Sequence, residues 1–513
     1  MYIGDYLARR ELYSPDRLAI VDTGKSPEWR LSYRQMNERA NRLANLLRGI
    51  GVARGDRVAI LAHDGVEHLD TFFACGKLGA VHTALNWRLH PRELADIMAR
   101  TAPRALIFSD DMRSQVAELQ ALLRGRPHAI GHYFHTEGDG VGGSTHYETA
   151  LRSSPATPVT TDGLEAEDIA ALIFTGGTTG LPKAAQVSHR MIAWNTLNTV
   201  IHDVTHDDVY LNVFPMFHTG GLFVYTLPQI IFGGVTILMR QFDPALVLEL
   251  IERERTTIFA AVPTMYQLIT QAPNWATADL SSLRFCTSGG APLPVPLVEQ
   301  YTREKGIRFK QGFGMTEFGP GIFALAPEDA IRKAGSIGRP NFYVDARIVD
   351  DDNRFLGPNE DGELVLKGPS YCSGYFHDPV ASVEAVDERG YFHTGDIARY
   401  DAEGYFYIVD RKKDMFISGG ENIYPAEIEK VLYGHPGVLM CAVIGLPDAK
   451  WGEVGKACVV LKPGVTADEA ELLAYMADRL AKYKVPRTVA IMDALPISSA
   501  GKILKRELKT IRN

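Results

Sequence analysis

The chain has 513 residues, of which 46% are hydrophobic and 23% are charged. This length exceeds what one compact core usually serves, so we expect two or three domains, and the composition excludes a fibrous or disordered protein. The formal net charge is −8 and the basic residues are scattered, which argues against nucleic acid as the main partner.

The chain has five cysteines that are widely spaced, with no CxxC pair and no Cys/His cluster suited to zinc. This usage is typical of a reducing compartment, so we expect a cytoplasmic protein. The amino terminus lacks an apolar core of signal-peptide length, and no apolar run approaches about 18 residues. We therefore expect neither secretion nor a transmembrane segment.

Short apolar or β-branched runs alternate with amphipathic stretches along the first half of the chain. A helix is expected at 33–48, with Ser32 as its cap, and the glycine- and histidine-rich stretch 125–144 is expected to be a surface connection. Buried strands are expected at 57–62, 105–109, 169–174 and 236–239. This alternation predicts a layered α/β architecture.

The run TGGTTGLPK at 175–183 follows the expected strand 169–174 directly. Its glycines let backbone N–H groups approach phosphate oxygens, and its threonines and lysine add donors and positive charge. The Gly-Lys-Ser/Thr spacing of a Walker A loop is absent. The run predicts a phosphate-binding loop made by Thr175, Gly176, Gly177, Thr178, Thr179, Gly180 and Lys183. Taken alone, such a turn is as often simple punctuation between elements.

Past Tyr391 the pattern of apolar and charged residues changes. Residues 404–409 are typical of a strand, and a charged break at 410–414 precedes a smaller α/β stretch. A domain boundary is expected at this break, between residues 1–410 and 411–513.

Several motifs follow the phosphate loop in a fixed order: FHTGG at 217–221, SGGAPL at 288–293, QGFGMTE at 311–317, YFHTGD at 391–396, DRKKDMFISGGENIYPAEIE at 410–429 and SSAGK at 498–502. This ordered set resembles the adenylate-forming superfamily, which includes acyl-CoA synthetases, luciferases and peptide-synthetase adenylation domains. The resemblance spans nearly the whole chain. It implies a large multi-sheet amino-terminal AMP-binding region and a small mobile carboxy-terminal α/β domain.

The resemblance implies ATP and Mg²⁺ as the nucleotide and its metal. Glu317 matches the family's magnesium carboxylate, and Thr316 matches a phosphate-contacting hydroxyl; in isolation, this Thr-Glu pair would be typical of a helix cap. Asp396 matches a ribose-binding carboxylate and Arg411 a second ribose or phosphate contact. The adenine and acyl groups are expected to lie along Gly289, Gly290, Ala291 and Pro292. Further ATP contacts are expected from Gln311, Gly312, Phe313 and Gly314, with the Phe313 ring stacking on adenine.

Lys502 matches the family's mobile catalytic lysine, which stabilises charge developing between the carboxylate and the α-phosphate.

His218 resembles a gate between ATP and the acyl pocket, although a lone histidine is more often a packed residue. The lining expected for the acyl pocket contains no obvious basic residue for a second carboxylate, and the FHTGG region contains no aspartate suited to bind an amino acid, so a bulky monocarboxylate is expected. The acyl pocket is expected to include Trp194, Phe217, Gly220, Gly221, Val262 and Phe323.

The resemblance further implies CoA as the acceptor and a hinge at Lys413. Val485 replaces a basic residue found in some relatives, and Trp451 is equally compatible with core packing. The expected CoA contacts are Ser418, Gly419, Gly420, Trp451, Tyr483 and Lys484.

These residues favour an AMP-forming acyl-CoA synthetase, an acid-thiol ligase that activates a fatty or aryl acid as acyl-AMP and transfers it to CoA. One alternative is a ligase that delivers its acyl group to a carrier protein, and another is a nucleotide-binding module without catalysis. Lys502 argues against the second, because a binder has no chemical need for it. A role in fatty acid metabolism is expected, and a homodimer is left open.

Overall fold

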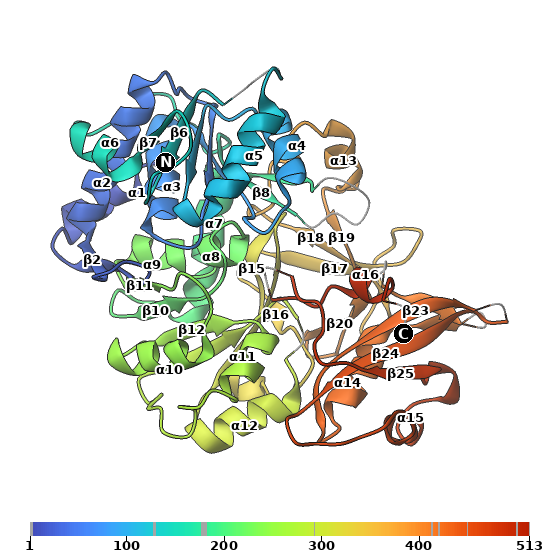
Figure 1. Cartoon of the computed structure of the whole chain (residues 1–513). Coiled ribbons are helices and arrows are strands. Elements are labelled where there is room, and N and C mark those ends of the chain that lie inside the picture. The colour runs from blue at the N-terminus through green and yellow to red at the C-terminus, as the bar shows by residue number, and fades with distance from the viewer. Residues whose placement is uncertain are drawn as a thin grey trace. The chain divides into compact units, whose positions relative to one another are not determined.

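A computed structural model describes residues 4–126, 130–175, 182–291, 293–411, 414–418, 421–448, 450–498 and 501–511. The chain has a mixed α/β fold with several sheets, as expected (Figure 1). It divides into two compact units. The first unit comprises residues 1–259, 314–322 and 368–384, and the second comprises 260–313, 323–367 and 385–513.

A seven-stranded sheet forms the centre of the first unit, in the order β7-β6-β5-β3-β4-β8-β9. All neighbours are parallel except β8 and β9, which form an antiparallel hairpin. The strands are β3 (Arg57–Leu61), β4 (Val81–Ala84), β5 (Ala105–Phe108), β6 (His132–His135), β7 (Ser144–His146), β8 (Ile169–Phe174) and β9 (Ala184–Ser188).

Both faces of this sheet are covered. Val58 and Ile60 of β3 pack into one apolar cluster with α2 and α3, whereas Ala59 and Leu61 pack into another with α4 and α5. Since successive side chains of a strand point to opposite faces, β3 is apolar on both faces from Val58 to Leu61. The helices are α1 (Tyr6–Tyr13), α2 (Tyr33–Gly49), α3 (Val66–Leu78), α4 (Pro91–Thr101), α5 (Arg113–Leu123) and α6 (Tyr147–Ser153).

A second group of strands in this unit has β11 between β10 and β1, all parallel, with β2 antiparallel beside β1. These strands are β1 (Leu18–Asp22), β2 (Trp29–Ser32), β10 (Val209–Asn212) and β11 (Val235–Leu238). The remaining helices of the unit are α7 (His189–Asn198), α8 (Thr219–Phe223), α9 (Thr226–Phe232), α10 (Pro244–Arg253) and α13 (Pro379–Glu384).

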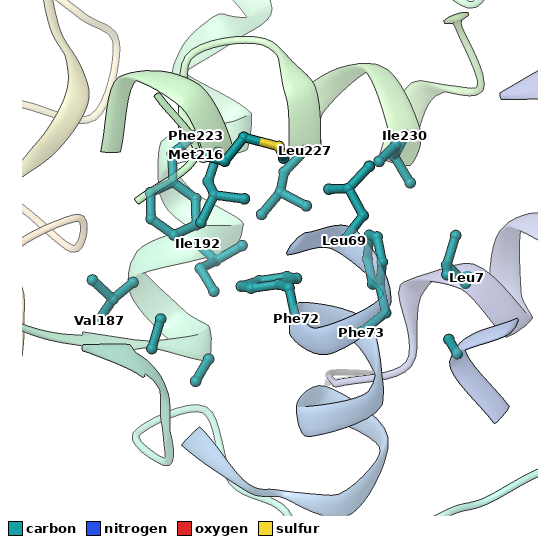
Figure 2. Packing of buried hydrophobic residues seen from close by; sticks show 14 of the residues in the cluster. Leu7, Leu69, Phe72, Phe73, Val187, Ile192, Met216, Phe223, Leu227 and Ile230 are labelled. Atoms are coloured by element: carbon teal, nitrogen blue, oxygen red, sulfur yellow. The ribbon is translucent and has the colours of Figure 1, made fainter. Parts of the chain in front are cut away.

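The FHTGG motif is anchored by an apolar cluster that Figure 2 shows from close by. Phe72 of α3 lies edge-on to Phe223 of α8, with ring centres 6.2 Å apart, and Ile192 of α7 joins them. All three side chains are buried. The helix that follows His218 is therefore held by packing against α3 and α7.

The second unit contains β13 (Phe285–Ser288) parallel to β14 (Phe309–Met315), with α11 (Pro263–Ile269) and α12 (Val295–Lys305). Strands β12 (Ile258–Ala261) and β15 (Gly319–Leu325) each have residues in both units; the end of β15 pairs with β16 (Arg339–Pro340). A four-stranded antiparallel sheet follows, made of β17 (Asp345–Val349), β18 (Gly362–Lys367), β19 (Phe392–Tyr400) and β20 (Phe406–Arg411).

A smaller α/β part ends the chain and is built on a five-stranded sheet. Val443 of β23 faces a cluster with α14 and α15, whereas Ala442 and Ile444 face a cluster with α16. Its elements are β21 (Phe416–Ser418), β22 (Glu421–Ile423), α14 (Pro425–Tyr433), β23 (Val438–Asp448), β24 (Gly452–Leu461), α15 (Glu469–Ala477), β25 (Thr488–Ile491) and α16 (Lys505–Leu508). Short 3-10 helices lie at Asp110–Met112, Thr199–His202, Pro327–Asp329 and Lys482–Lys484.

The expected strands 57–62, 105–109, 169–174 and 236–239 are confirmed as β3, β5, β8 and β11, and 404–409 corresponds to β20. Ser32 caps α2 through a reciprocal pair of hydrogen bonds with Gln35.

The expectation of a surface connection at 125–144 was wrong in part. Residues His132–His135 form β6, which pairs in parallel with β5 and buries Phe134. The sequence gives little signal for this strand, because it begins and ends with histidine rather than with apolar residues. The strand is stabilised by backbone pairing with β5, which lies more than 20 residues earlier in the chain. Among the described helices, none combines the length and apolar character needed to cross a membrane.

Asp64, just after β3, anchors the segment that leads into FHTGG. Its carboxylate accepts the backbone N–H of Met216 at 2.8 Å. Burial raises the pKa of Asp64 to about 7, and the Met216 hydrogen bond and the charge of Arg88 only partly oppose that rise.

We predict that Asp64→Asn makes stability less sensitive to pH. Because the pKa of Asp64 is higher in the folded than in the unfolded chain, stability is lost as the pH rises from about 4 to about 7, by a fraction of the ~1.4 kcal/mol per pH unit that one full proton would give. Asparagine retains an oxygen for Met216 N–H. The apparent Tm of both proteins, measured between pH 5 and pH 8, should fall less in the variant; parallel curves would contradict this.

Candidate active site

The β8–β9 hairpin carries the expected phosphate loop. The backbone N–H of Thr175 donates to Lys183 O at 2.8 Å, and its hydroxyl donates to the same oxygen at 3.3 Å. Lys183 is exposed and stands directly before β9. The loop residues Gly176, Gly177, Thr178, Thr179 and Gly180 lie outside the described residues. The hairpin thus places a hydroxyl at one end of the loop and an ammonium group at the other.

Glu317 lies against a segment that is distant in sequence but belongs to the same unit. Its backbone oxygen accepts the N–H of Cys372 at 2.7 Å, and its Oε1 accepts the hydroxyl of Tyr375 at 2.9 Å. Lys183 Nζ lies 4.8 Å from the centre of the Tyr375 ring, as in a cation–π contact. Tyr375 therefore connects the expected magnesium carboxylate to the expected phosphate-binding lysine.

Sequence reasoning did not single out Tyr375. Burial raises the pKa of its hydroxyl, and the charge of Glu317 raises it further, so the phenol remains a donor. Glu317 and Tyr375 are 58 positions apart, and no local pattern connects them. Thr316, beside Glu317, is buried.

His218 is the N-cap of α8. Its Nδ1 accepts the backbone N–H of Gly220 at 3.1 Å, which makes this nitrogen the unprotonated one in the present arrangement. Phe217 beside it is buried. A gating movement of this imidazole would have to break the cap, so the gate stays a prediction.

Asn195 is a second residue that sequence reasoning missed. It follows Trp194 on α7; its Nδ2 donates to Phe223 O at 2.8 Å and its Oδ1 accepts Gly321 N–H at 3.2 Å. One buried amide therefore ties α7, α8 and the start of β15 together within the first unit. Helices α7 and α8 carry three of the expected acyl-pocket residues, namely Trp194, Gly220 and Gly221.

The second unit contains most of the expected adenine and acyl contacts. Gln311 on β14 is buried, and its Nε2 donates to Ser336 O at 3.0 Å. The rings of Phe313 and Phe323 meet edge-on with centres 5.8 Å apart, and Phe323 also contacts Phe406 at 5.0 Å. Pro292 lies outside the described residues. The strip Gly289–Ala291 follows β13, and Gly312 lies on β14, directly beside that strand.

Asp396 and Arg411 are cross-strand neighbours in β19 and β20. Asp396 is 1% exposed, and its backbone N–H donates to Thr394 Oγ1 at 3.0 Å. Antiparallel partners lie about 5 Å apart, so both expected ribose contacts belong to one short stretch of sheet.

Lys502 is brought to the SGGAP strip. A Cβ placed on Gly290 would lie 3.2 Å from Lys502 Cε and 3.5 Å from Val262 Cγ1. The carbonyl of Gly501 accepts the Thr264 hydroxyl at 2.9 Å. Gly501 has φ +76°, and a Cβ there would lie only 2.5 Å from Val262 Cγ2. Glycine before the lysine is therefore required by backbone conformation and by close approach.

Two of the expected CoA contacts, Trp451 and Tyr483, are exposed aromatic residues. Trp451 is 46% exposed, which excludes the core-packing alternative, and Tyr483 is 49% exposed. Lys484 Nζ donates to Glu427 at 2.7 Å and 2.8 Å. Ser418 ends β21. Gly419, Gly420 and the hinge residue Lys413 lie outside the described residues.

The Glu317 carboxylate fits a magnesium ion that enters the site bound to a nucleotide. In the described part of the chain, no group of three or more His, Cys, Asp or Glu side chains is placed to hold a metal. Mg²⁺ in nucleotide sites usually takes one or two carboxylates, with waters and phosphates for the remainder. Glu317 is partly exposed and oriented by Tyr375, so it can supply that carboxylate.

Gly220 and Gly221 both lie in α8 but differ in their surroundings. A Cβ on Gly221 would lie 2.7 Å from Phe214 O and closer still to Pro215 O, whereas one on Gly220 would meet only side-chain atoms, at 3.3 Å. The backbone atoms of Phe214 and Pro215 can move away from such a Cβ only at a large cost in free energy.

We therefore predict that Gly221→Ala lowers stability by about 1–3 kcal/mol, whatever the acid bound. Gly220→Ala is the matched control and should change the apparent Tm much less. Thermal unfolding of the two variants without ligands decides this. Equal losses would mean that the contact with Pro215 does not constrain position 221.

Two family models match the chain. The AMP-binding enzyme family matches residues 7–376, and the AMP-binding enzyme C-terminal domain matches residues 427–502. The first model covers most of the expected amino-terminal region 1–410, and the second covers most of the expected carboxy-terminal region 411–513.

Known proteins resemble it over nearly the full length. A feruloyl-CoA synthase of Amycolatopsis sp is 42% identical over 99% of this chain and 98% of its own. A long-chain-fatty-acid–CoA ligase of Mycobacterium tuberculosis is 38% identical over 99% of this chain and 98% of its own. The structure of the anthranilate CoA ligase AuaEII with anthranoyl-AMP aligns with a TM-score of 0.91 at 27% identity, covering 99% of this chain and 97% of that one. The chain therefore belongs to the AMP-binding enzyme family, within the adenylate-forming superfamily that contains the acyl-CoA synthetases.

Proposed function

We propose that the protein activates an aromatic or fatty monocarboxylic acid with ATP, releasing pyrophosphate, and then transfers the acyl group from acyl-AMP to CoA. The observation that carries this proposal is the approach of Lys502 to Gly290, with Gly501 beside Val262 and held by the hydrogen bond from Thr264. A nucleotide-binding module without catalysis has no need to bring a terminal lysine there.

In the first step a carboxylate oxygen attacks the α-phosphorus of ATP, and the main tasks are alignment and neutralisation of charge. Lys502 would donate to the carboxylate and α-phosphate oxygens as negative charge shifts between them. Asp396, with two carboxylate oxygens, suits the two ribose hydroxyls, and Arg411 is its cross-strand neighbour. Phe313 offers an aromatic face to the adenine.

The phosphate end of ATP is proposed to meet Thr175, Lys183 and the intervening glycines, with Thr316 adding a hydroxyl. Lys183 is exposed, so its ammonium group can reach an incoming phosphate. Mg²⁺, held by Glu317, would neutralise phosphate charge when it is bound. Glu317 itself is kept in orientation by its hydrogen bond from Tyr375.

The acid is proposed to be aromatic, because the relative that is 42% identical is a feruloyl-CoA synthase. The apolar side chains of Trp194, Phe217, Val262 and Phe323 suit a flat ring, and His218 would separate the acid from ATP. A fatty acid is the second candidate, since a long-chain-fatty-acid–CoA ligase is 38% identical.

Thioester formation is assigned to a second arrangement of a domain comprising residues 411–513, turning at Lys413 after an AMP-binding domain of residues 1–410. The exposed aromatic rings of Trp451 and Tyr483 support this, because such faces can stack on the CoA adenine. All five cysteines are unpaired, which supports a reducing, cytoplasmic location. A homodimer stays a prediction.

The function is tested with a panel of cinnamic, benzoic and fatty acids, scored by AMP release with and without CoA and by the mass of the thioester. Release of AMP that requires both an aromatic acid and CoA supports the proposal. Acyl-AMP that forms but passes only to a carrier protein would favour the carrier-dependent alternative, and a fatty-acid optimum would overturn the aromatic assignment.

We predict that Lys502→Ala slows acyl-AMP formation by about a hundredfold or more, because one charge contact in the transition state is lost. Thioester formation from supplied acyl-AMP should be largely retained. Lys509→Ala removes an exposed lysine nearby and serves as the control. Equal loss of both half-reactions in a folded Lys502 variant would argue against alternating use of the lysine.

A further inference from the structure

Tyr375 occupies a fixed place at the edge of the seven-stranded sheet. The backbone of residues 373–376 pairs with the outer side of β9: Ser373 N–H donates to Gln186 O and Gln186 N–H to Gly374 O, both at 2.9 Å, and Phe376 N–H donates to Ala184 O at 2.8 Å. The edge strand therefore sets the direction of the Tyr375 ring. Tyr375 is 9% exposed.

Two groups that contact the Tyr375 side chain belong to the phosphate end of the expected site. The hydroxyl donates to Glu317 Oε1 at 2.9 Å, and Lys183 Nζ lies 4.8 Å from the ring centre. A second hydrogen bond, from Cys372 N–H to Glu317 O at 2.7 Å, fixes the backbone of the same glutamate. The segment that contains Tyr375 thus holds both the main chain and the side chain of Glu317.

A carboxylate that binds a cation through one oxygen gains from a neutral donor on the other. The donor selects one rotamer and keeps the two oxygens from exchanging roles, and the loss of such partners typically costs about 10–100-fold in metal affinity or activity. A phenol does this without adding charge, so the carboxylate keeps its attraction for a divalent cation.

We propose that Tyr375 is a positioning residue that orients the Glu317 carboxylate toward the divalent cation of the nucleotide, while its ring steadies Lys183. This inference rests on the proposed function, in which Glu317 meets Mg²⁺-ATP. It adds a residue from a separate segment to the phosphate-binding apparatus.

The test compares Tyr375→Phe with the wild type by direct Mn²⁺ binding, followed by electron paramagnetic resonance in the presence of a non-hydrolysable ATP analogue. We expect the Kd for Mn²⁺ to rise about tenfold. The KM for Mg²⁺ in acid-dependent pyrophosphate release should rise in parallel, whereas kcat at saturating Mg²⁺ should change much less. Phenylalanine retains the ring, so the Kd of the ATP analogue without metal should stay unchanged.

Tyr405→Phe is the matched control, because its hydroxyl also donates to a carboxylate, Asp329 Oδ2 at 2.5 Å, in the other unit. It should leave Mn²⁺ binding unchanged. Tyr375→Leu removes the ring as well as the hydroxyl and should in addition weaken binding of the metal-free analogue, through Lys183.

A double-mutant comparison makes the assignment specific. Glu317→Gln should weaken Mn²⁺ binding, and adding Tyr375→Phe should then have little further effect. Independent, additive losses would overturn the proposal, as would normal Mn²⁺ binding in Tyr375→Phe. The absence of acid-dependent turnover in the wild type would refute the proposed function, whereas the Mn²⁺ measurements would still decide the role of Tyr375.

Discussion

The pairing of residues 373–376 with the outer edge of β9 is the constraint on which the phosphate end of the site depends. β9 is also one arm of the hairpin that bears the expected phosphate loop. The same strand therefore fixes Lys183 through its own chain and Glu317 through the segment that pairs with it. Edge strands usually need protection from unwanted pairing. Here the free edge is occupied by a segment that brings a functional side chain with it.

The residues of the first unit form a chain of contacts from the phosphate loop to the acyl-pocket candidates. Asn195 joins α7 to α8 and to the start of β15, a few residues after Glu317. Phe223 of α8 packs on Phe72, and Asp64 holds Met216 just before His218. Buried polar groups with satisfied hydrogen bonds specify one arrangement of their neighbours. The FHTGG segment is consequently positioned from three sides.

The sequence was sufficient for the class of fold and for the family, because the motifs that carry the resemblance are short and their order is informative. The strands β3, β5, β8 and β11 were predictable from apolar runs, since both faces of these strands are buried. Strand β6 was not, because its histidines carry no apolar signal. Tyr375, Asn195 and Asp64 were missed for one physical reason: each acts through a hydrogen bond to a residue far away in the chain, and only the tertiary fold makes those pairs neighbours.

The loop that carries Lys502 is closed on itself. Ser498 N–H donates to Lys502 O at 2.6 Å, Leu504 N–H donates to Pro496 O at 2.8 Å, and Ile497 and Ile503 form a bridge. None of these bonds involves Thr264 or Val262. The described residues of this loop, 496–498 and 501–504, are therefore joined by bonds that do not depend on its docking partners, and the conformational entropy of these residues is lost once, when the chain folds. If the lysine leaves and returns in each catalytic cycle, it moves as a preformed part. The equilibrium between the docked and undocked positions of the lysine is then set by a few contacts, such as the hydrogen bond from the Thr264 hydroxyl. Because these contacts are few, a bound substrate can readily shift that equilibrium.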